Sequence, residues 1–421
     1  MHTETADIAL SPLTGVGGRD VFIARQPIFD HKKRVHAYEL LFRGGLENIC
    51  PPGDSHDAAT QTIQAAWLTF GLPTLIGKTK AFANFSRDLL VSGQGLSLPA
   101  ASTVIELLET IDPDPEVLAA CRQLKEAGYT LALDDFVYRP ALDPLIALAD
   151  IIKIDFRDSD PAEQAELVRR TAPHGPKLLA EKVETHEEYG LAKTLGFSYF
   201  QGYFFCKPET VQGRALRGTP LTYLKLLQCV TKPDFDIDEL ESIIGVDVSV
   251  THALMRYLGS AAFGLRSDVR DIRHGLVLLG REQTRRFVSL VALGEMGRHK
   301  PSEILVTAAT RAKFCEMVGT DLGLEDRRPE LFLVGALSLV DAMLDQPMSQ
   351  VLVELPLADD LKQALLGGSS PLRPALEFVE RYERGDWAAC ARLENSTGVS
   401  GVAAYKRYKD AVSWAASAWQ A

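Results

Sequence analysis

The sequence predicts an α/β barrel followed by an all-α bundle, and three observations support this prediction. From Val21 to Pro208, short β-branched or aromatic runs alternate with longer amphipathic stretches, a pattern typical of βα units. From Leu221 to Trp419, apolar residues recur with the helical period and convincing strands are few. The length of 421 residues exceeds that of a usual single core, so at least two domains are expected. Roughly eight strands with helical crossovers indicate a compact TIM-like barrel.

The predicted strands all lie in the first half of the chain. They cover residues 22–29, 36–43, 80–85, 102–107, 129–136, 151–156, 177–183 and 197–205. Helical spacing occupies residues 58–72, 115–128, 161–175 and 185–196, and the last three of these segments end at a glycine that can cap a helix. Only a short turn, FDHKKR, separates the first two strands, so they should form a hairpin with one antiparallel strand. We expect a flexible segment over residues 1–20, the barrel over 21–210 and the helical domain over 211–421.

Composition excludes several functional classes. The formal net charge of -11 and the isoelectric point near 5.4 disfavour general nucleic-acid binding, because the mean field repels polyanions. The arginines of residues 266–287 are expected on the solvated face of helices. Six scattered cysteines offer no zinc spacing. No apolar run is long enough to span a membrane and the start lacks signal-peptide features, so we expect a cytoplasmic protein without membrane contact.

Acidic or amide side chains stand at the ends of seven predicted strand segments, where they would point into one shared mouth. With one strand-borne lysine, they are Glu39, Asn84, Glu106, Asp134, Asp135, Lys153, Asp155, Glu181, Glu184 and Gln201. Such a mouth is suited to hard divalent cations and phosphates. Any one of these acids alone could instead cap a helix or form a structural ion pair. Together, and without a metal, they should repel one another, so some should bind protons or draw in Lys153.

These motifs resemble those of EAL-domain cyclic di-GMP phosphodiesterases, beginning with Glu39-Leu40-Leu41 at the signature tripeptide. The resemblance implies two divalent cations, Mg²⁺ or Mn²⁺, and cleavage of cyclic di-GMP to linear pGpG. It assigns metal ligation to Glu39, Asn84, Glu106, Asp134 and Asp135. It assigns catalysis to Lys153 and Glu181, and contacts with the substrate or its surroundings to Arg43, Asp155, Glu184 and Gln201. Arginine suits a phosphate because its guanidinium presents two parallel donors.

Two departures from the family pattern bear on activity. Leu40 replaces alanine in the signature, a mild change because this residue binds no metal. The paired aspartates then run into residues 136–143, where active members carry a loop rich in glycine and serine. Val137, Tyr138 and Pro140 remove the conformational freedom that such a loop would use. Active EAL domains often dimerise through this loop, so a homodimer is left open.

The second half resembles the HDOD domain through residues 254–293, where Gly264 and Gly280 should end helices. Ile272, Leu276, Leu279, Phe287 and Leu290 should face its core. Hydrolytic relatives hold a metal with an adjacent His-Asp pair, but this chain has Ser338 and Leu339 at the corresponding place. The resemblance therefore implies protein contacts rather than hydrolysis.

The isolated histidines of this half lack a partner at ligand spacing, so structural roles are expected for them. They are His252, His274 and His299.

Three functions follow as hypotheses. The favoured one is a bacterial signalling protein with a degenerate EAL domain that binds cyclic di-GMP or acts as a regulator, with weak or no turnover, and with an HDOD domain that contacts proteins. The second is an active metal-dependent phosphodiesterase that tolerates the altered loop. The third is an adaptor that works without nucleotide.

Overall fold

The structure is a computed structural model that describes residues 21–44, 75–207, 219–232, 234–246, 271–297, 300–355, 357–397 and 401–420. The predicted helix at 58–72, the segment 1–20, Gly264, His252 and His299 lie outside these ranges. None of the described helices is long and apolar enough to cross a membrane.

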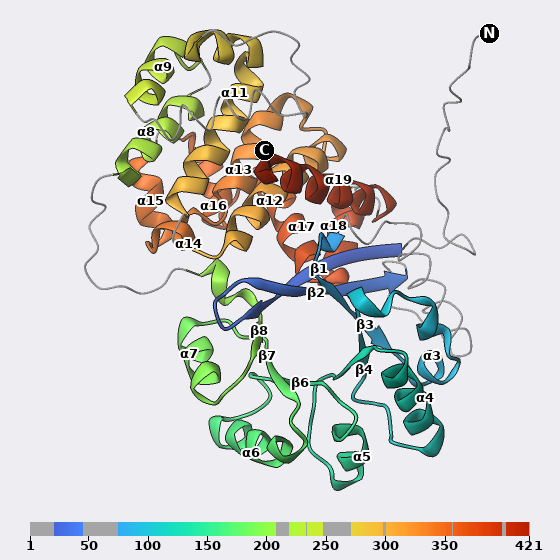
Figure 1. Ribbon diagram of the computed structural model, residues 1–421. Coiled ribbons are helices and arrows are strands. Elements are labelled where there is room, and N and C mark those ends of the chain that lie inside the picture. The colour runs from blue at the N-terminus through green and yellow to red at the C-terminus, as the bar shows by residue number, and fades with distance from the viewer. Residues whose placement is uncertain are drawn as a thin grey trace, which may run out of the picture.

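Eight strands form one closed barrel in sequence order, as Figure 1 shows. They are β1 (Val21–Asp30), β2 (Val35–Gly44), β3 (Lys80–Phe85), β4 (Thr103–Leu107), β5 (Thr130–Leu133), β6 (Ile151–Asp155), β7 (Lys177–Glu181) and β8 (Tyr199–Gln201). β1 pairs antiparallel with both β2 and β8, and every other pair is parallel. The predicted barrel with one antiparallel strand is confirmed.

The interior of the barrel has layers because successive side chains of a strand point to opposite faces. One apolar residue from each strand forms the middle layer: Ile28, Ala37, Phe82, Val104, Ala132, Ile151, Leu179 and Tyr199. Two positions further toward the carboxyl ends of the parallel strands, each strand supplies a polar residue: Gln26, Glu39, Asn84, Glu106, Asp134, Lys153, Glu181 and Gln201. In β1 the step runs backwards, from Ile28 to Gln26, because that strand is antiparallel. The polar mouth therefore rests on an apolar floor.

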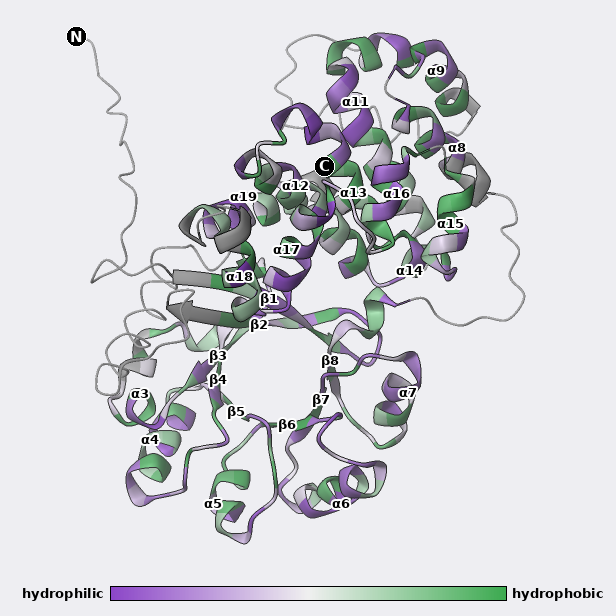
Figure 2. Cartoon of the chain, turned by 180° about the vertical axis from the view of Figure 1, so that it is seen from behind, coloured by the Kyte–Doolittle hydropathy of each residue, from purple (hydrophilic) through white to green (hydrophobic). Residues whose placement is uncertain are grey.

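Short helices surround the barrel (Figure 2). They are α3 (Arg87–Val91), α4 (Pro115–Glu126), α5 (Asp143–Ile146), α6 (Pro161–Thr171) and α7 (His186–Thr194). Asp160 and Thr185 begin α6 and α7 with capping boxes, in which the side chain satisfies a free backbone N–H. Gly128, Gly175 and Gly196 follow α4, α6 and α7 with positive φ, as predicted.

The described part of the second half contains only helices. They are α8 (Thr219–Thr231), α9 (Ile237–Val246), α11 (Ile272–Met296), α12 (Ser302–Asp321), α13 (Arg328–Leu337), α14 (Val340–Leu344), α15 (Met348–Glu354), α16 (Asp359–Leu365), α17 (Arg373–Glu383), α18 (Trp387–Thr397) and α19 (Gly401–Gln420). The predicted break at Gly280 is present, since this residue has φ 71° inside α11. Leu276, Leu279, Phe287 and Leu290 are buried as expected.

The helical region packs on the outer side of β1 and β2, where Figure 1 shows α17 to α19 beside the hairpin. The Tyr38 hydroxyl donates a hydrogen bond of 2.8 Å to Glu303 of α12. The guanidinium of Arg25 lies 4.4 Å from the centre of the Tyr38 ring. In return, the hydroxyl of Tyr382 donates to the carbonyl oxygen of Ile23 over 3.2 Å. Outward residues of the hairpin thus contact helices, while the inward ones reach the mouth.

Candidate functional site

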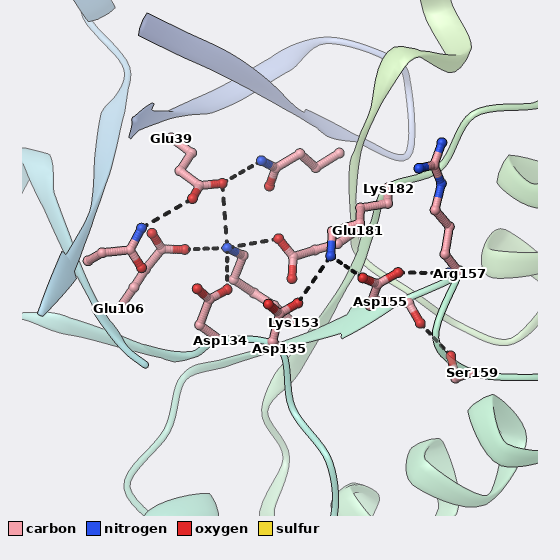
Figure 3. Close-up of polar contacts among 12 residues, drawn as sticks. Glu39, Glu106, Asp134, Asp135, Lys153, Asp155, Arg157, Ser159, Glu181 and Lys182 are labelled. Carbon is pink, nitrogen blue, oxygen red and sulfur yellow. Dashed lines mark hydrogen bonds and ion pairs between the residues drawn. The ribbon is translucent and has the colours of Figure 1, made fainter. Parts of the chain in front are cut away.

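Lys153 occupies the centre of the barrel mouth and is surrounded by four carboxylates (Figure 3). Its Nζ lies 2.6 Å from oxygens of Glu106 and Asp134, 2.9 Å from Glu181 and 3.5 Å from Glu39. The Lys153 side chain is only 1% exposed. The four acids come from β2, β4, the end of β5 and β7, so the predicted convergence is correct. The expectation that the acids draw in Lys153 is also confirmed.

Glu39 is held in place by two amides, one from the adjacent strand β3 and one from β8, which lies beyond β1. Asn84 donates to one of its oxygens over 3.4 Å, and Gln201 donates to the other. The same amide nitrogen of Gln201 lies 3.1 Å from the Gln26 side-chain oxygen. Gln26 was missed at the sequence level because it lies within β1 rather than at a strand end. The hairpin could have revealed it, since Gln26 pairs with Glu39 in register.

Burial dominates the proton equilibria of this cluster. Removal from water raises the pKa of Glu106 well above its usual value, and Lys153 opposes that rise. Burial likewise raises the pKa of Glu181 to about 8 against the effect of Lys153. Burial alone would lower the pKa of Lys153, but the surrounding carboxylates, Glu106 first, raise it well above the usual range. Lys153 therefore stays charged, and its charge favours the ionised forms of the surrounding acids.

The paired aspartates point to different partners. Asp134 contacts Lys153, whereas Asp135 lies 3.7 Å from Lys182, which also pairs with Asp155. Asp135 and Lys182 have positive φ angles of 39° and 54°, a conformation that residues other than glycine seldom adopt. Burial and the neighbouring Asp134 raise the pKa of Asp135. Lys182 thus anchors a second small acidic group beside the first.

The remaining predicted residues lie further out. Glu184 forms ion pairs with Arg157 and, over 3.3 Å, with Lys207, and its side chain is 37% exposed. Asp155 is buried and accepts a hydrogen bond of 2.7 Å from the backbone of Arg157. The side chain of Arg43 lies outside the described part of the chain, although its backbone belongs to β2.

The donor chemistry of the mouth fits a hard divalent cation. Five oxygens of the mouth are buried without a hydrogen-bond donor, namely Asn84 Oδ1, Glu106 Oε1 and Oε2, Glu181 Oε2 and Gln201 Oε1. Glu106 Oε1 is the one that lies 2.6 Å from Lys153 Nζ. Buried polar atoms normally find partners, and carboxylate and amide oxygens are the ligands of Mg²⁺ and Ca²⁺. Across the described residues, no three or more His, Cys, Asp or Glu side chains are grouped so as to hold a metal ion. Lys153 Nζ lies between the carboxylates, so a cation would have to displace it.

The segment after the paired aspartates is fixed by several contacts. The backbone N–H of Phe136 donates to the carbonyl of Lys153 over 3.0 Å, and the Phe136 ring is buried. The Tyr138 ring lies 4.5 Å from the guanidinium of Arg170, and Arg139 pairs with Asp112 over 3.6 Å. Pro140 then begins a short 3₁₀ turn that leads into α5. These contacts tie the segment to β6, α6 and the residues that precede α4.

A cavity of about 260 Å³ lies between this loop and the ends of β4 and β5. Asp134, Asp135 and Arg139 line it together with Val137, whose side chain is 73% exposed. The cavity thus connects the acidic mouth with the altered loop.

The segment of the helical half that corresponds to the His-Asp pair of hydrolytic relatives contains Ser338 and Asp341. The Ser338 hydroxyl donates to the carbonyl of Gly335 and accepts from Arg311. Burial raises the pKa of the nearby Asp341. His274 lies in α11, where its backbone N–H donates to Asp271. The Ser338 hydroxyl is thus engaged in hydrogen bonds within the helical region.

Family profiles match both halves. The EAL domain profile matches residues 81–208 and the HDOD domain profile matches residues 216–343. The EAL match begins in β3, so β1 and β2, which carry Gln26 and Glu39, precede it.

Two curated relatives cover most of the chain. The cyclic di-GMP phosphodiesterase CdgJ of Vibrio cholerae is 35% identical over 369 residues, which are 87% of this chain and 85% of the relative. The uncharacterized protein YuxH of Bacillus subtilis is 34% identical over 405 residues, or 94% and 98% of the two chains.

Among solved structures, Klebsiella pneumoniae BlrP1 in complex with calcium and cyclic di-GMP is 27% identical, with a TM-score of 0.38, over 47% of this chain and 57% of that one. The two matched domains follow one another in the order that the strands and helices predicted. From these matches and the two full-length relatives, the chain belongs to the family of proteins that join an EAL domain to an HDOD domain.

Proposed function

We propose that the EAL domain binds cyclic di-GMP together with a divalent cation, Mg²⁺ or Mn²⁺, and cleaves one phosphodiester bond to give linear pGpG. The observation that carries this proposal is the ring of buried oxygen donors around Lys153, in which several oxygens lack a hydrogen-bond donor. The curated relative CdgJ, named a cyclic di-GMP phosphodiesterase, supports the choice of substrate.

Glu39, Asn84, Glu106, Asp134 and Asp135 would hold the cation. When bound, the cation would act as a Lewis acid toward the phosphate and would lower the pKa of nearby water. Glu39 is oriented for this role by Asn84 and Gln201, which fix both of its oxygens.

The chain's own groups would handle the proton. Glu181, in its ionised form, would accept a proton from the attacking water. Lys153 lies 2.9 Å from Glu181 before a cation displaces it from between the carboxylates, and it would then stabilise negative charge on the phosphate. The apolar floor beneath them would limit the entry of water from the other end of the barrel.

Substrate turnover tests the proposal. Cyclic di-GMP is incubated with the full chain and Mn²⁺, and the products are separated by chromatography. We expect pGpG, and we expect the rate to fall by at least about 100-fold in Glu39→Gln, because a metal ligand is lost. Glu166→Gln, an exposed change on α6, is the matched control and should keep the activity. Absence of pGpG at high protein concentration would exclude the enzyme.

The anchored loop favours a second candidate, namely binding of cyclic di-GMP without turnover. Phe136 and Tyr138 fix the segment where mobile glycines are expected in active members. Isothermal titration with cyclic di-GMP and Ca²⁺ separates the candidates, because a receptor gives heat without product. If neither heat nor product is observed, the adaptor function is the one that remains.

We also propose that the HDOD region contacts partner proteins. Two adjacent apolar residues of α11 support this role, because Val277 and Leu278 are 56% and 38% exposed.

A further inference from the structure

A second cavity lies at the opposite end of the barrel from the acidic mouth. Its volume is about 530 Å³, and it is lined by the residues that begin β3, β5, β6, β7 and β8. Three of its lining residues, Val104, Ile151 and Tyr199, belong to the apolar middle layer. The cavity therefore lies directly beneath that layer and is separated by it from Lys153.

The lining of this cavity is basic, although the chain as a whole is acidic. Lys80, Lys125, Lys177, His36 and His174 face a single acid, Asp150. Lys125 neutralises Asp150 with contacts of 2.5 and 2.6 Å. Two positive charges remain even with both histidines neutral, in a protein of net charge -11.

Among the described residues, the partners of the two remaining lysines are neutral. Lys80 donates to the hydroxyl of Thr130 over 3.2 Å, and Lys177 donates to the hydroxyl of Tyr199 over 3.1 Å. No carboxylate of the described residues forms an ion pair with either lysine. They occupy equivalent inward positions of β3 and β7, two residues below Phe82 and Leu179 of the apolar layer. Both ammonium groups therefore border the same cavity.

The positive charges of Lys80 and Lys177 act on His36, which also lines the cavity. Its ring stacks on Tyr199 with centroids 4.3 Å apart. Burial lowers the pKa of His36, Lys177 and Lys80 lower it further, and only Asp30 opposes them. Asp30 is itself paired with Arg34. The two lysines thus act together on a group inside the cavity.

We propose that this cavity binds a small anion that carries phosphate groups. Two ammonium groups match the two negative charges of a phosphate near neutral pH, and ammonium groups form strong charge-assisted hydrogen bonds to its oxygens. The volume lies in the range of small-molecule sites and exceeds what a single phosphate fills. Anion binding here goes beyond the proposed function and would stand without it.

The test uses the full chain with EDTA, so that the acidic mouth has no metal to attract anions. Inorganic pyrophosphate is titrated while the His36 ring protons are followed by NMR, and His36→Gln identifies that signal among the nine histidines. An anion beside His36 should raise the pKa of His36 by about one pH unit, because a nearby negative charge stabilises the protonated ring. Inorganic phosphate and guanosine monophosphate form parallel arms that distinguish a free phosphate from a nucleotide ligand.

The Lys80→Gln/Lys177→Gln variant should bind pyrophosphate at least about tenfold more weakly, because two charge-assisted hydrogen bonds are lost. Glutamine keeps a donor for Thr130 and Tyr199, so the fold should survive. Lys225→Gln, an exposed change on α8, should bind like the unaltered chain. A His36 pKa that does not respond to any of the three anions would overturn the proposal, and so would equal binding by the double variant. The first of these outcomes does not depend on the variant folding.

Discussion

Tyr38 of the barrel and Glu303 of the helical region share a buried hydrogen bond of 2.8 Å across 265 positions of sequence. Arg25 lies over the same tyrosine ring, and its positive charge favours the ionised form of the carboxylate. The interface is therefore built around an ionisable group that is removed from water. A buried carboxylate in such a place links the stability of the interface to pH.

Stability should fall as the pH rises above the usual pKa of glutamate. Burial raises the pKa of Glu303 in the folded chain, so the folded state binds its proton more tightly than the unfolded state. The free energy of unfolding then decreases from about pH 4.5 upward until Glu303 is ionised in the folded chain, by about 1.4 kcal/mol for each pKa unit of difference. Urea unfolding from pH 4.5 to 8 should show a shallower fall in Glu303→Gln. Equal slopes in Glu303→Gln, the unaltered chain and the surface control Glu166→Gln would contradict this assignment.

Removal of the Lys153 ammonium group should destabilise the barrel in the absence of metal. Lys153→Met leaves four carboxylates around an apolar side chain, and breaking a buried ion pair costs about 3–5 kcal/mol. Denaturant unfolding in EDTA measures this loss, and Mn²⁺ should recover part of it because the freed oxygens can bind the metal. Lys232→Met removes an exposed ion pair with Glu239 and should leave stability nearly unchanged. A Lys153→Met chain as stable as the unaltered one would show that the acids are already neutral.

Gly202 should tolerate no side chain. It follows Gln201 with φ 139°, and a Cβ there would lie 2.1 Å from the carbonyl oxygen of Val183. Gly202→Ala should cost about 3 kcal/mol or more and displace Gln201 from Glu39, with loss of cyclic di-GMP binding. Gly190→Ala is the control, because nothing lies within 4 Å of its Cβ in α7, and it should stabilise the chain by up to about 1 kcal/mol. Similar melting temperatures for the two variants would refute the close contact.

Loosening the loop after Asp135 should raise turnover. Val137→Gly/Pro140→Gly increases backbone freedom while leaving the buried Phe136 in place. It should lower stability by about 1 kcal/mol or more, because glycine increases the conformational entropy of the unfolded chain. If the stiff loop limits catalysis, the rate of pGpG formation rises severalfold in steady-state assays. Hydrogen exchange of the loop amides checks that the segment has been freed. If the loop amides exchange faster but the rate of pGpG formation is unchanged, the stiffness of the loop does not limit catalysis.

The barrel and its mouth were accessible from sequence because both depend on local pattern. Strand period and the short FDHKKR turn gave the eight strands and the hairpin, and residues at strand ends gave the acids. Other features depend on geometry that no local pattern encodes. Asp135 lies 3.7 Å from Lys182, and both residues adopt positive φ, which the sequence does not signal in residues other than glycine. The contact of Tyr38 with Glu303 joins two domains, so neither residue stands out alone.

The antiparallel β1 has a consequence for any shortened version of this protein. This strand closes the ring by pairing with both β2 and β8. A fragment that starts at residue 81, where the EAL profile match begins, would leave β3 and β8 as bare edges with unpaired backbone groups. It would also lose Glu39, together with the outer surface on which α17 and α19 rest. Such a fragment should aggregate rather than report on the chemistry of the intact mouth.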